Sequence, residues 1–239
     1  MQAPFTGRIS HASALACAVG VLVLTNLANN RWIPSWILLT AVVSTCVLVL
    51  LLLRAGGEWA DLGLARDSLG TGVRWALALI GIVAAVYVCA AALPATRHLF
   101  EDNRNDGLGL PEVLLKSLMM VPLGTVLLEE TAFRGVLYGL IQRMRGPTAA
   151  MLGSSLLFGL WHILPSLNLA NDKPALTSTF GNSVLGTVLV ELGTVLFTAA
   201  AGCVLCLLRN RSGSLLAPMG LHWATNALGY VFGYLWSRA

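Results

Sequence analysis

The sequence predicts an all-α membrane protein, a polytopic bundle of seven or eight transmembrane helices around a buried polar cavity. Of its 239 residues, 56% are hydrophobic and only 11% are charged, whereas an ordinary soluble domain has roughly 25% charged residues. Five windows free of Asp, Glu, Lys and Arg reach the roughly 20 residues that a helix needs to cross a bilayer; they are residues 9–30, 32–53, 75–96, 146–171 and 212–237. We expect one integral-membrane domain over 1–239.

The N-terminal third supplies the first three of these helices. The window 9–30 follows a short segment with one arginine, which is also how a signal peptide begins. No small-residue cleavage site of the A-x-A type closes this window, and further apolar windows follow, so we interpret it as an uncleaved helix. The windows 32–53 and 75–96 are the second and third predicted helices.

The next two helices are predicted to form a hairpin. Residues 111–142 are apolar but interrupted by charge, and they begin at Pro111 with an acid in the first turn, where the helix dipole favours one. The sequence "RMRGP" then predicts a tight turn, with Gly146 ending one helix and Pro147 beginning the next. Gly135 and Gly139 form a G-x-x-x-G pair, which usually allows two helices to approach closely.

Two more apolar stretches complete the bundle. Residues 174–208 contain Glu191 and make a further span, and residues 212–237 make the last one. Glu191 has two open interpretations: it is solvated near the external mouth, or it lines the same interior as the glutamates of the fourth span. The motif-bearing core of the domain runs from residue 111 to 236.

The distribution of basic residues predicts the orientation. With a cytoplasmic N-terminus, eight basic residues lie inside and five outside, so the positive-inside rule favours this arrangement. A composition rich in Ala, Leu, Val and Arg is typical of bacteria, so we expect the bacterial cytoplasmic membrane. The net charge of +4 contains no basic run that would indicate nucleic-acid binding. The oligomeric state is left open.

Three charged residues inside the fourth span separate into two roles. Charges at membrane depth are costly and usually face a protein interior, form pairs or mark function. At 100° per residue, Arg134 lies about 40° from Glu130 and about 140° from Glu129 around the helix. Glu130 and Arg134 thus form a favourable (i, i+4) pair, with the glutamate first. Glu129 faces elsewhere without a local counter-ion, as a general base would.

Two histidines at membrane depth are predicted to join Glu129. Glu129 lies 17 residues before Gly146 and His162 lies 16 residues after it, so a hairpin brings both to the same depth, about 25 Å from the turn. His222 and Asn226, four residues apart on the last span, point from one helix face at a similar level. Three helices therefore converge on one polar cluster. It suits peptide-bond hydrolysis, with a carboxylate that activates water and donors that hold the oxyanion.

The motifs "EETAFRG", "FGLWH" and "HWATN" together resemble the E-E-x-x-x-R, F-x-x-x-H and H-x-x-x-N motifs of the CPBP (or Abi) family, which includes the type II CAAX prenyl endopeptidases. All three occur in the family's order, and "ADLGL" is similar to its first cytoplasmic loop. The resemblance implies an intramembrane endopeptidase with an all-helical fold.

The same resemblance implies a role for each matched residue. Glu129 is the glutamate that activates water, His162 is its partner, and His222 and Asn226 stabilise the oxyanion. Glu130 and Arg134 support the site. We expect no cofactor and no metal, because a glutamate-dependent hydrolysis also accounts for Asn226. The alternative is a catalytic zinc held by Glu129, His162 and His222.

The expected partner is a membrane-tethered protein or peptide substrate, within the lipid bilayer. Prenylated CAAX proteins are not the default expectation in a bacterium, so we predict proteolysis without a CAAX substrate, and the substrate's identity is left open. A function of another class also fits these residues: a non-catalytic membrane scaffold, or an immunity or interaction protein, in which the polar cluster only locks helices together. A proton-coupled transporter fits less well, because no pair of broken helices occurs in matching halves.

Overall fold

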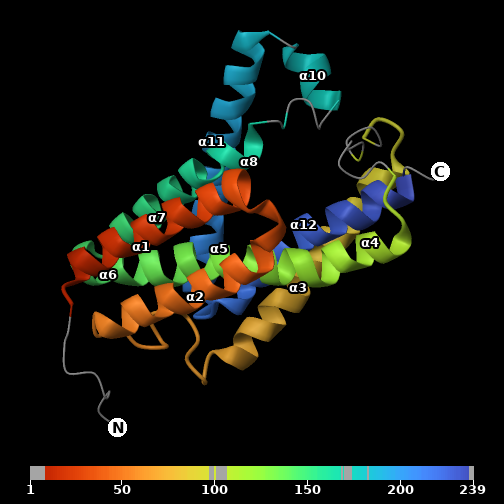
Figure 1. Ribbon diagram of the computed structural model, residues 1–239. Helices are drawn as coiled ribbons and strands as arrows, with labels where there is room; N and C mark the ends of the chain where they lie inside the picture. The colour runs from red at the N-terminus through yellow and green to blue at the C-terminus, as the bar shows by residue number, and fades with distance from the viewer. Residues whose placement is uncertain are drawn as a thin grey trace.

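The computed structural model describes residues 9–96, 100, 107–167, 169, 174–181 and 183–236, and every regular element in this part of the chain is a helix (Figure 1). The all-α prediction is therefore confirmed. Five basic residues that the orientation depends on lie outside the described residues, and the orientation stays a prediction; they are Arg8, Arg97, Arg104, Lys173 and Arg238.

The helices follow one another along the chain with short breaks, and several are joined end to end by π-helical or 3₁₀ turns, labelled η. In order they are α1 (His11–Leu27), η1 (Ala28–Trp32), η2 (Pro34–Trp36), α2 (Ile37–Arg54), α3 (Leu69–Ala92), α4 (Leu110–Leu115), η5 (Lys116–Val126), α5 (Leu127–Glu129), η6 (Glu130–Leu137), α6 (Tyr138–Arg145), α7 (Pro147–Trp161), α8 (Ile163–Ser166), α10 (Pro174–Phe180), α11 (Val184–Ser212) and α12 (Leu216–Trp236).

Six helical stretches of the described chain are long and apolar enough to cross a membrane; they are His11–Trp32, Pro34–Arg54, Leu69–Ala92, Leu110–Arg145, Pro147–Ser166 and Val184–Ser212. This agrees with the predicted polytopic bundle, and six of its seven or eight predicted spans meet this criterion in the described chain. The predicted last span forms α12, a helix of 21 residues, but Pro218, His222 and Asn226 lower its hydropathy. Six such helices support an integral membrane protein.

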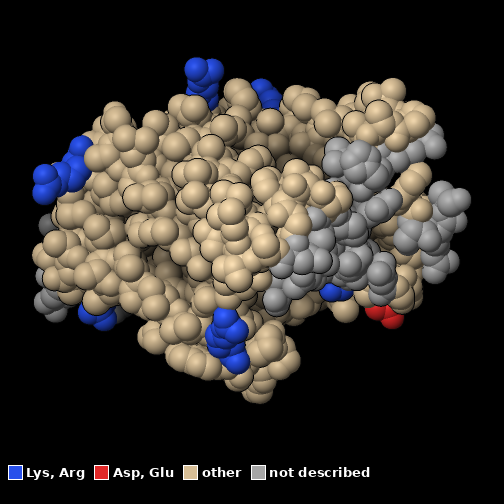
Figure 2. Space-filling view, turned by 90° about the horizontal axis from the view of Figure 1, so that it is seen from above, with Lys and Arg blue, Asp and Glu red and all other residues tan. Residues whose placement is uncertain are grey.

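The surface of the molecule agrees with this environment. Figure 2 shows a face that is mostly uncharged, on which basic side chains stand apart from one another. Large apolar side chains are exposed on several spans, including Val184 (83% exposed), Phe197 (74%) and Leu77 (64%). Exposed apolar surface of this extent marks contact with lipid or with another protein.

The stretch from α4 to α6 is one continuous run of 36 residues across the middle of the bundle (Figure 1). Pro122 lies inside η5. Since proline has no N–H, the Ser117 carbonyl lacks the donor five residues on that a π-helix would supply. Trp223 of α12 donates its indole Nε1–H to this carbonyl at 3.0 Å. The proline therefore creates the acceptor that fixes α12 against η5.

The predicted hairpin is confirmed. Gly146 has a φ of 82°, a conformation that glycine adopts without strain, and its N–H donates to the Gln142 carbonyl at 2.9 Å. Pro147 then occupies the first position of α7. This turn lays α7 back along α6 and carries His162 toward the level of Glu129.

The G-x-x-x-G pair does not pack on another helix as expected. A Cβ on Gly139 would lie 3.3 Å from both Cβ and the carbonyl oxygen of Asp61, and one on Gly135 would lie 3.0 Å from the Leu62 side chain. Asp61 and Leu62 belong to the connection between α2 and α3. Because these two glycines have no side chain, the loop between α2 and α3 packs closely against η6 and α6.

Candidate active site

Glu130 is the centre of a buried charge network. Arg134 donates from Nη1 to Glu130 Oε1 at 3.1 Å, and both side chains are fully buried. His222 Nδ1 lies 2.7 Å from the same oxygen. Because an ionised carboxylate only accepts hydrogen bonds, Nδ1 carries a proton and donates it. The predicted Glu130–Arg134 pair is confirmed, and His222 is its third member.

Glu129 lies beside this network with its two oxygens in different surroundings. Oε1 accepts a hydrogen bond of 3.0 Å from Nε1 of Trp161 on α7. Oε2 has no hydrogen-bond partner among the described residues and lies 3.8 Å from Nε2 of His222. A separation of this size between two polar groups suits one bridging water. One oxygen of Glu129 is thus anchored, and the other is a buried acceptor without a hydrogen-bond partner among the described residues.

Trp161 is itself held in place by a feature that the sequence reasoning did not use. Pro165 lies four residues later and has no N–H, so the Trp161 carbonyl has no helical donor. Asn26 of α1 donates to this carbonyl at 2.8 Å, and Asn30 in turn donates to the Asn26 side chain at 2.6 Å. Asn26, which is itself held by Asn30, therefore fixes the tryptophan that hydrogen-bonds Glu129.

Phe158, one turn before His162 on α7, packs beneath the site. The Arg134 guanidinium lies 3.9 Å from the centre of the Phe158 ring, and the His162 ring meets it edge-on at 4.6 Å. His162 Nδ1 lies 2.8 Å from the Phe158 carbonyl. A carbonyl only accepts, so Nδ1 donates and Nε2 of the neutral ring is an acceptor.

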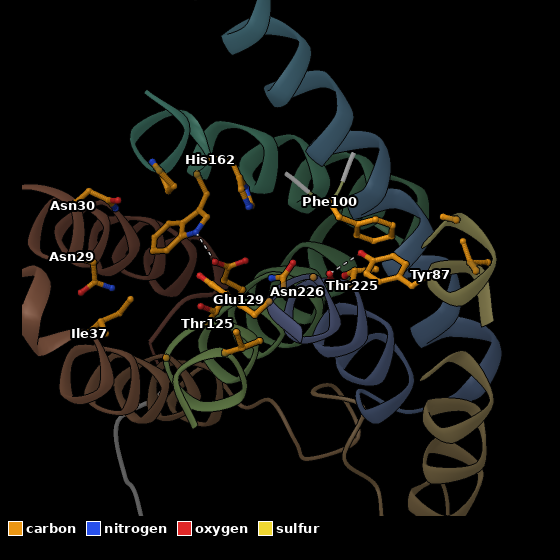
Figure 3. Close-up of a pocket in the computed structure, with 18 residues that line it drawn as sticks. Asn29, Asn30, Ile37, Tyr87, Phe100, Thr125, Glu129, His162, Thr225 and Asn226 are labelled. Carbon is orange, nitrogen blue, oxygen red and sulfur yellow. Dashed lines mark hydrogen bonds between the residues drawn. The ribbon is translucent and has the colours of Figure 1, made fainter. Parts of the chain in front are cut away.

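A cavity of about 650 Å³ opens at Glu129, and its lining includes His162 and Asn226. Figure 3 shows Glu129 and Asn226 near its middle, with Asn29 and Asn30 on one side and Tyr87 and Phe100 on the other. The cavity therefore offers amide groups at one end and aromatic rings at the other.

The structure brings the predicted residues together in a different way from that expected. Glu129 does not hydrogen-bond to His162 in the described structure; its partner is the neighbouring Trp161. His222 and Asn226 also divide, since Asn226 is exposed and lines the cavity, whereas His222 is buried behind Glu129.

Glu191 lies apart from this cluster. Its Oε1 accepts from the Ser166 hydroxyl at 2.9 Å, and it does not line the cavity at Glu129. The sequence left two interpretations of Glu191 open. The structure excludes the one in which Glu191 lines the same interior as Glu129 and Glu130.

The sequence left a zinc ion held by Glu129, His162 and His222 as the alternative to metal-free hydrolysis. Within the described part of the chain, no three His, Cys, Asp or Glu side chains are grouped closely enough to hold a metal ion. The Nδ1 atoms of both histidines are engaged, and only His222 Nε2 approaches Glu129. No step of the chemistry below is therefore derived through a metal.

These features define an integral membrane protein with a buried glutamate and two histidines beside an internal cavity. Residues 111–228, about half of the chain, match the family model described as "Type II CAAX prenyl endopeptidase Rce1-like". This match confirms, over that segment, the resemblance seen in the three motifs. No curated protein and no solved structure matches the chain. The family supports a protease of the CAAX type that acts on a membrane-associated protein.

Proposed function

We propose that this protein is an intramembrane endopeptidase that hydrolyses a peptide bond in a membrane-associated protein or peptide. The observation that carries the proposal is the asymmetry of Glu129. Its Oε1 accepts from Trp161 at 3.0 Å, its Oε2 has no hydrogen-bond partner among the described residues, and it lines a cavity with His162 and Asn226. A carboxylate that is fixed through one oxygen and keeps an unused acceptor on the other is suited to act as a general base.

In the first step, Glu129 takes a proton from a water molecule that its free oxygen holds. The oxygen of that water attacks the carbonyl carbon of the substrate peptide bond, and the carbonyl oxygen becomes an oxyanion. Nε2 of His162 accepts the second hydrogen of the water and fixes its direction. His162 accepts through Nε2 because its Nδ1 already donates to the Phe158 carbonyl at 2.8 Å.

Stabilisation of the oxyanion falls to Asn226 and His222. The Asn226 carboxamide is exposed and makes no hydrogen bond to another described side chain, so its N–H groups are free for substrate. Glu130 accepts from His222 Nδ1 at 2.7 Å and stabilises a positive imidazole, whose Nε2 faces Glu129 at 3.8 Å, so its charge acts on the oxyanion from behind Glu129. Collapse of the intermediate breaks the C–N bond, and Glu129 returns its proton to the leaving amine.

The test of this proposal is cleavage of a membrane-tethered peptide by the purified protein in lipid. Glu129→Gln keeps the acceptor for Trp161 but removes the base, so cleavage is expected to fall at least about a thousandfold, near the upper end of the usual contribution of a general base and its positioning. Glu191→Gln is the matched control, because it changes an acid of another span that hydrogen-bonds Ser166. Full activity of Glu129→Gln would overturn the proposal.

Metal-free hydrolysis predicts two further results. The active protein contains less than one zinc per chain by elemental analysis, and a strong chelator such as 1,10-phenanthroline leaves cleavage unchanged. Stoichiometric zinc, together with a loss of activity that added zinc restores, would show the metal mechanism instead.

The scaffold function is distinguished by its effect on stability. The fully buried Glu130–Arg134 pair suits a cluster that locks helices, but such a cluster does not require a cavity at Glu129. If the cluster only locks helices, Glu129→Gln lowers the unfolding temperature and no variant shows proteolysis.

The substrates are identified by comparing membrane-protein termini in cells that carry the wild-type protein with those in cells that carry Glu129→Gln. A prenylated peptide and its unprenylated counterpart separate a CAAX substrate from other peptides.

A further inference from the structure

A second cavity lies away from Glu129, where α6, α7 and α11 meet the loop that follows α2. Its volume is about 690 Å³. The polar side chains that line it carry two positive charges and one negative charge; they are Asp61, Gln142, Arg143, Arg209 and Asn210. Ala60 and Asp61 of the "ADLGL" segment border this cavity, but the three motifs at Glu129 and the chemistry proposed there do not involve it.

Arg209 is a buried cation whose hydrogen-bond partners are neutral. Only 7% of it is exposed, and its guanidinium lies 4.5 Å from the centre of the Tyr138 ring. It donates to the Asp61 backbone carbonyl and, at 3.5 Å, to the Asn210 side chain. The dipole of α11 favours a cation in its last turn, but an exposed arginine would serve that purpose without the cost of burial.

The single acid of the cavity is already committed to another cation. Arg143 binds the Asp61 carboxylate through two hydrogen bonds, of 3.1 Å from Nε and 2.7 Å from Nη2. No carboxylate of the described chain forms an ion pair with Arg209. The side chains that line the cavity thus carry one more positive than negative charge, and an anionic ligand would balance it.

The beginning of α7 adds further positive potential. Pro147 lines the cavity and is the first residue of this 15-residue helix, whose N-terminus has no side-chain cap. The N–H groups of the first turn and the helix dipole favour an anion at such an end. Guanidinium groups and helix N-termini together are what phosphate groups bind in proteins.

The cavity also lies at the ends of membrane-spanning stretches, which is where phospholipid headgroups are expected. It is bounded by the ends of three membrane-spanning stretches, where α6 and α11 finish and α7 begins. Trp59, which is 56% exposed, precedes Ala60 on the cavity rim, and exposed tryptophan is enriched at the membrane–water interface. We propose that this cavity binds the phosphate group of an anionic phospholipid, with Arg209 as its main contact.

The full-length protein in neutral detergent tests this proposal by its thermal unfolding midpoint. Phosphatidylglycerol at a hundred times its Kd is expected to raise the midpoint by about 5–10 °C. Zwitterionic phosphatidylcholine is expected to give less than half of that shift. Stabilisation by inorganic phosphate without an effect of phosphatidylglycerol would assign the cavity to the free ion and overturn the lipid.

Variants at the end of α11 locate the effect. Arg209→Gln is expected to lose at least two thirds of the phosphatidylglycerol shift, whereas Arg209→Lys retains most of it. Arg211→Gln is the matched control, because Arg211 is exposed two residues away and does not line the cavity; it keeps the whole shift. If Arg209→Gln does not fold, Arg143→Gln, which frees the Asp61 carboxylate to repel the anion, replaces it. Equal shifts in the wild type and these cavity variants would refute the site.

Discussion

Replacing Arg134 with methionine tests the buried network that underlies the candidate active site. Methionine is also unbranched but carries no charge. The change therefore leaves the fully buried Glu130 without its cation, which lies 3.1 Å away in the wild type. Removing one partner of a buried ion pair costs about 3–5 kcal/mol. Glu130 keeps its hydrogen bond to His222 at 2.7 Å. The loss of stability from breaking the ion pair is therefore expected at the lower end of this range. Loss of the cation–π contact with Phe158 adds up to about 2 kcal/mol.

The expected total for Arg134→Met is therefore a loss of about 3–5 kcal/mol in the free energy of unfolding. In a chain of this size each kcal/mol lowers the unfolding midpoint by roughly 2–4 °C, so the midpoint should fall by about 6–20 °C. Thermal unfolding in detergent measures it, with the exposed Arg211→Met as the control.

A second substitution separates loss of charge balance from loss of volume. In Glu130→Gln/Arg134→Met both charges are absent, and the Gln oxygen still accepts from His222, so at least half of the lost stability should return. A midpoint within about 2 °C of the wild type for Arg134→Met, well below the expected shift, would refute the reasoning. So would a double variant that is no more stable than Arg134→Met alone.

Three further outcomes follow from the site and its packing. Asn226→Ala should lower kcat of peptide cleavage about 10²–10³-fold, the usual loss for one oxyanion donor, with an unchanged unfolding midpoint because Asn226 is exposed; normal kcat would contradict its role. Trp161→Phe removes a hydrogen bond to a carboxylate, worth about 1.5–3 kcal/mol, so cleavage should fall at least about tenfold, while contact with Phe133 persists. Gly159→Ala should destabilise the protein by about 1–3 kcal/mol, because its Cβ would lie 2.6 Å from the Val195 carbonyl oxygen; Gly153→Ala, which meets only the Ile141 side chain at 3.3 Å, is its control.

Local sequence rules were sufficient for most of the fold. The windows without charge predicted where helices run, and Gly146 with Pro147 predicted the hairpin, because both depend on neighbouring residues alone. The predicted last span also forms a helix, α12, although His222 and Asn226 lower its hydropathy. A helix that carries polar groups toward a protein interior does not need to be apolar all round.

The site was predictable in its members but not in its contacts. Glu130 and Arg134 are four residues apart in one helix, so geometry alone predicted their pair. The partner of Glu129 depends on how α7 ends: its last residue is Trp161, and His162 begins a turn with φ of −81° and ψ of −4°. The helical segment from 130 to 137 is also π-helical, which changes the angle between successive side chains. Counting residues from the turn at Gly146 gives the depth alone, and Trp161 and His162 differ in depth by only about 1.5 Å, so this count could not distinguish the tryptophan from the histidine.

Two prolines of the bundle have a consequence for how a substrate reaches Glu129. Pro165 and Pro122 each free a carbonyl, and side chains of other helices occupy both, namely Asn26 on α1 and Trp223 on α12. In lipid no water can replace such a donor, so exposing either carbonyl costs several kcal/mol. The contacts between α1 and α7 and between α12 and η5 are therefore expected to stay closed. Entry of a substrate from the bilayer costs the least free energy between helices that share no such hydrogen bond.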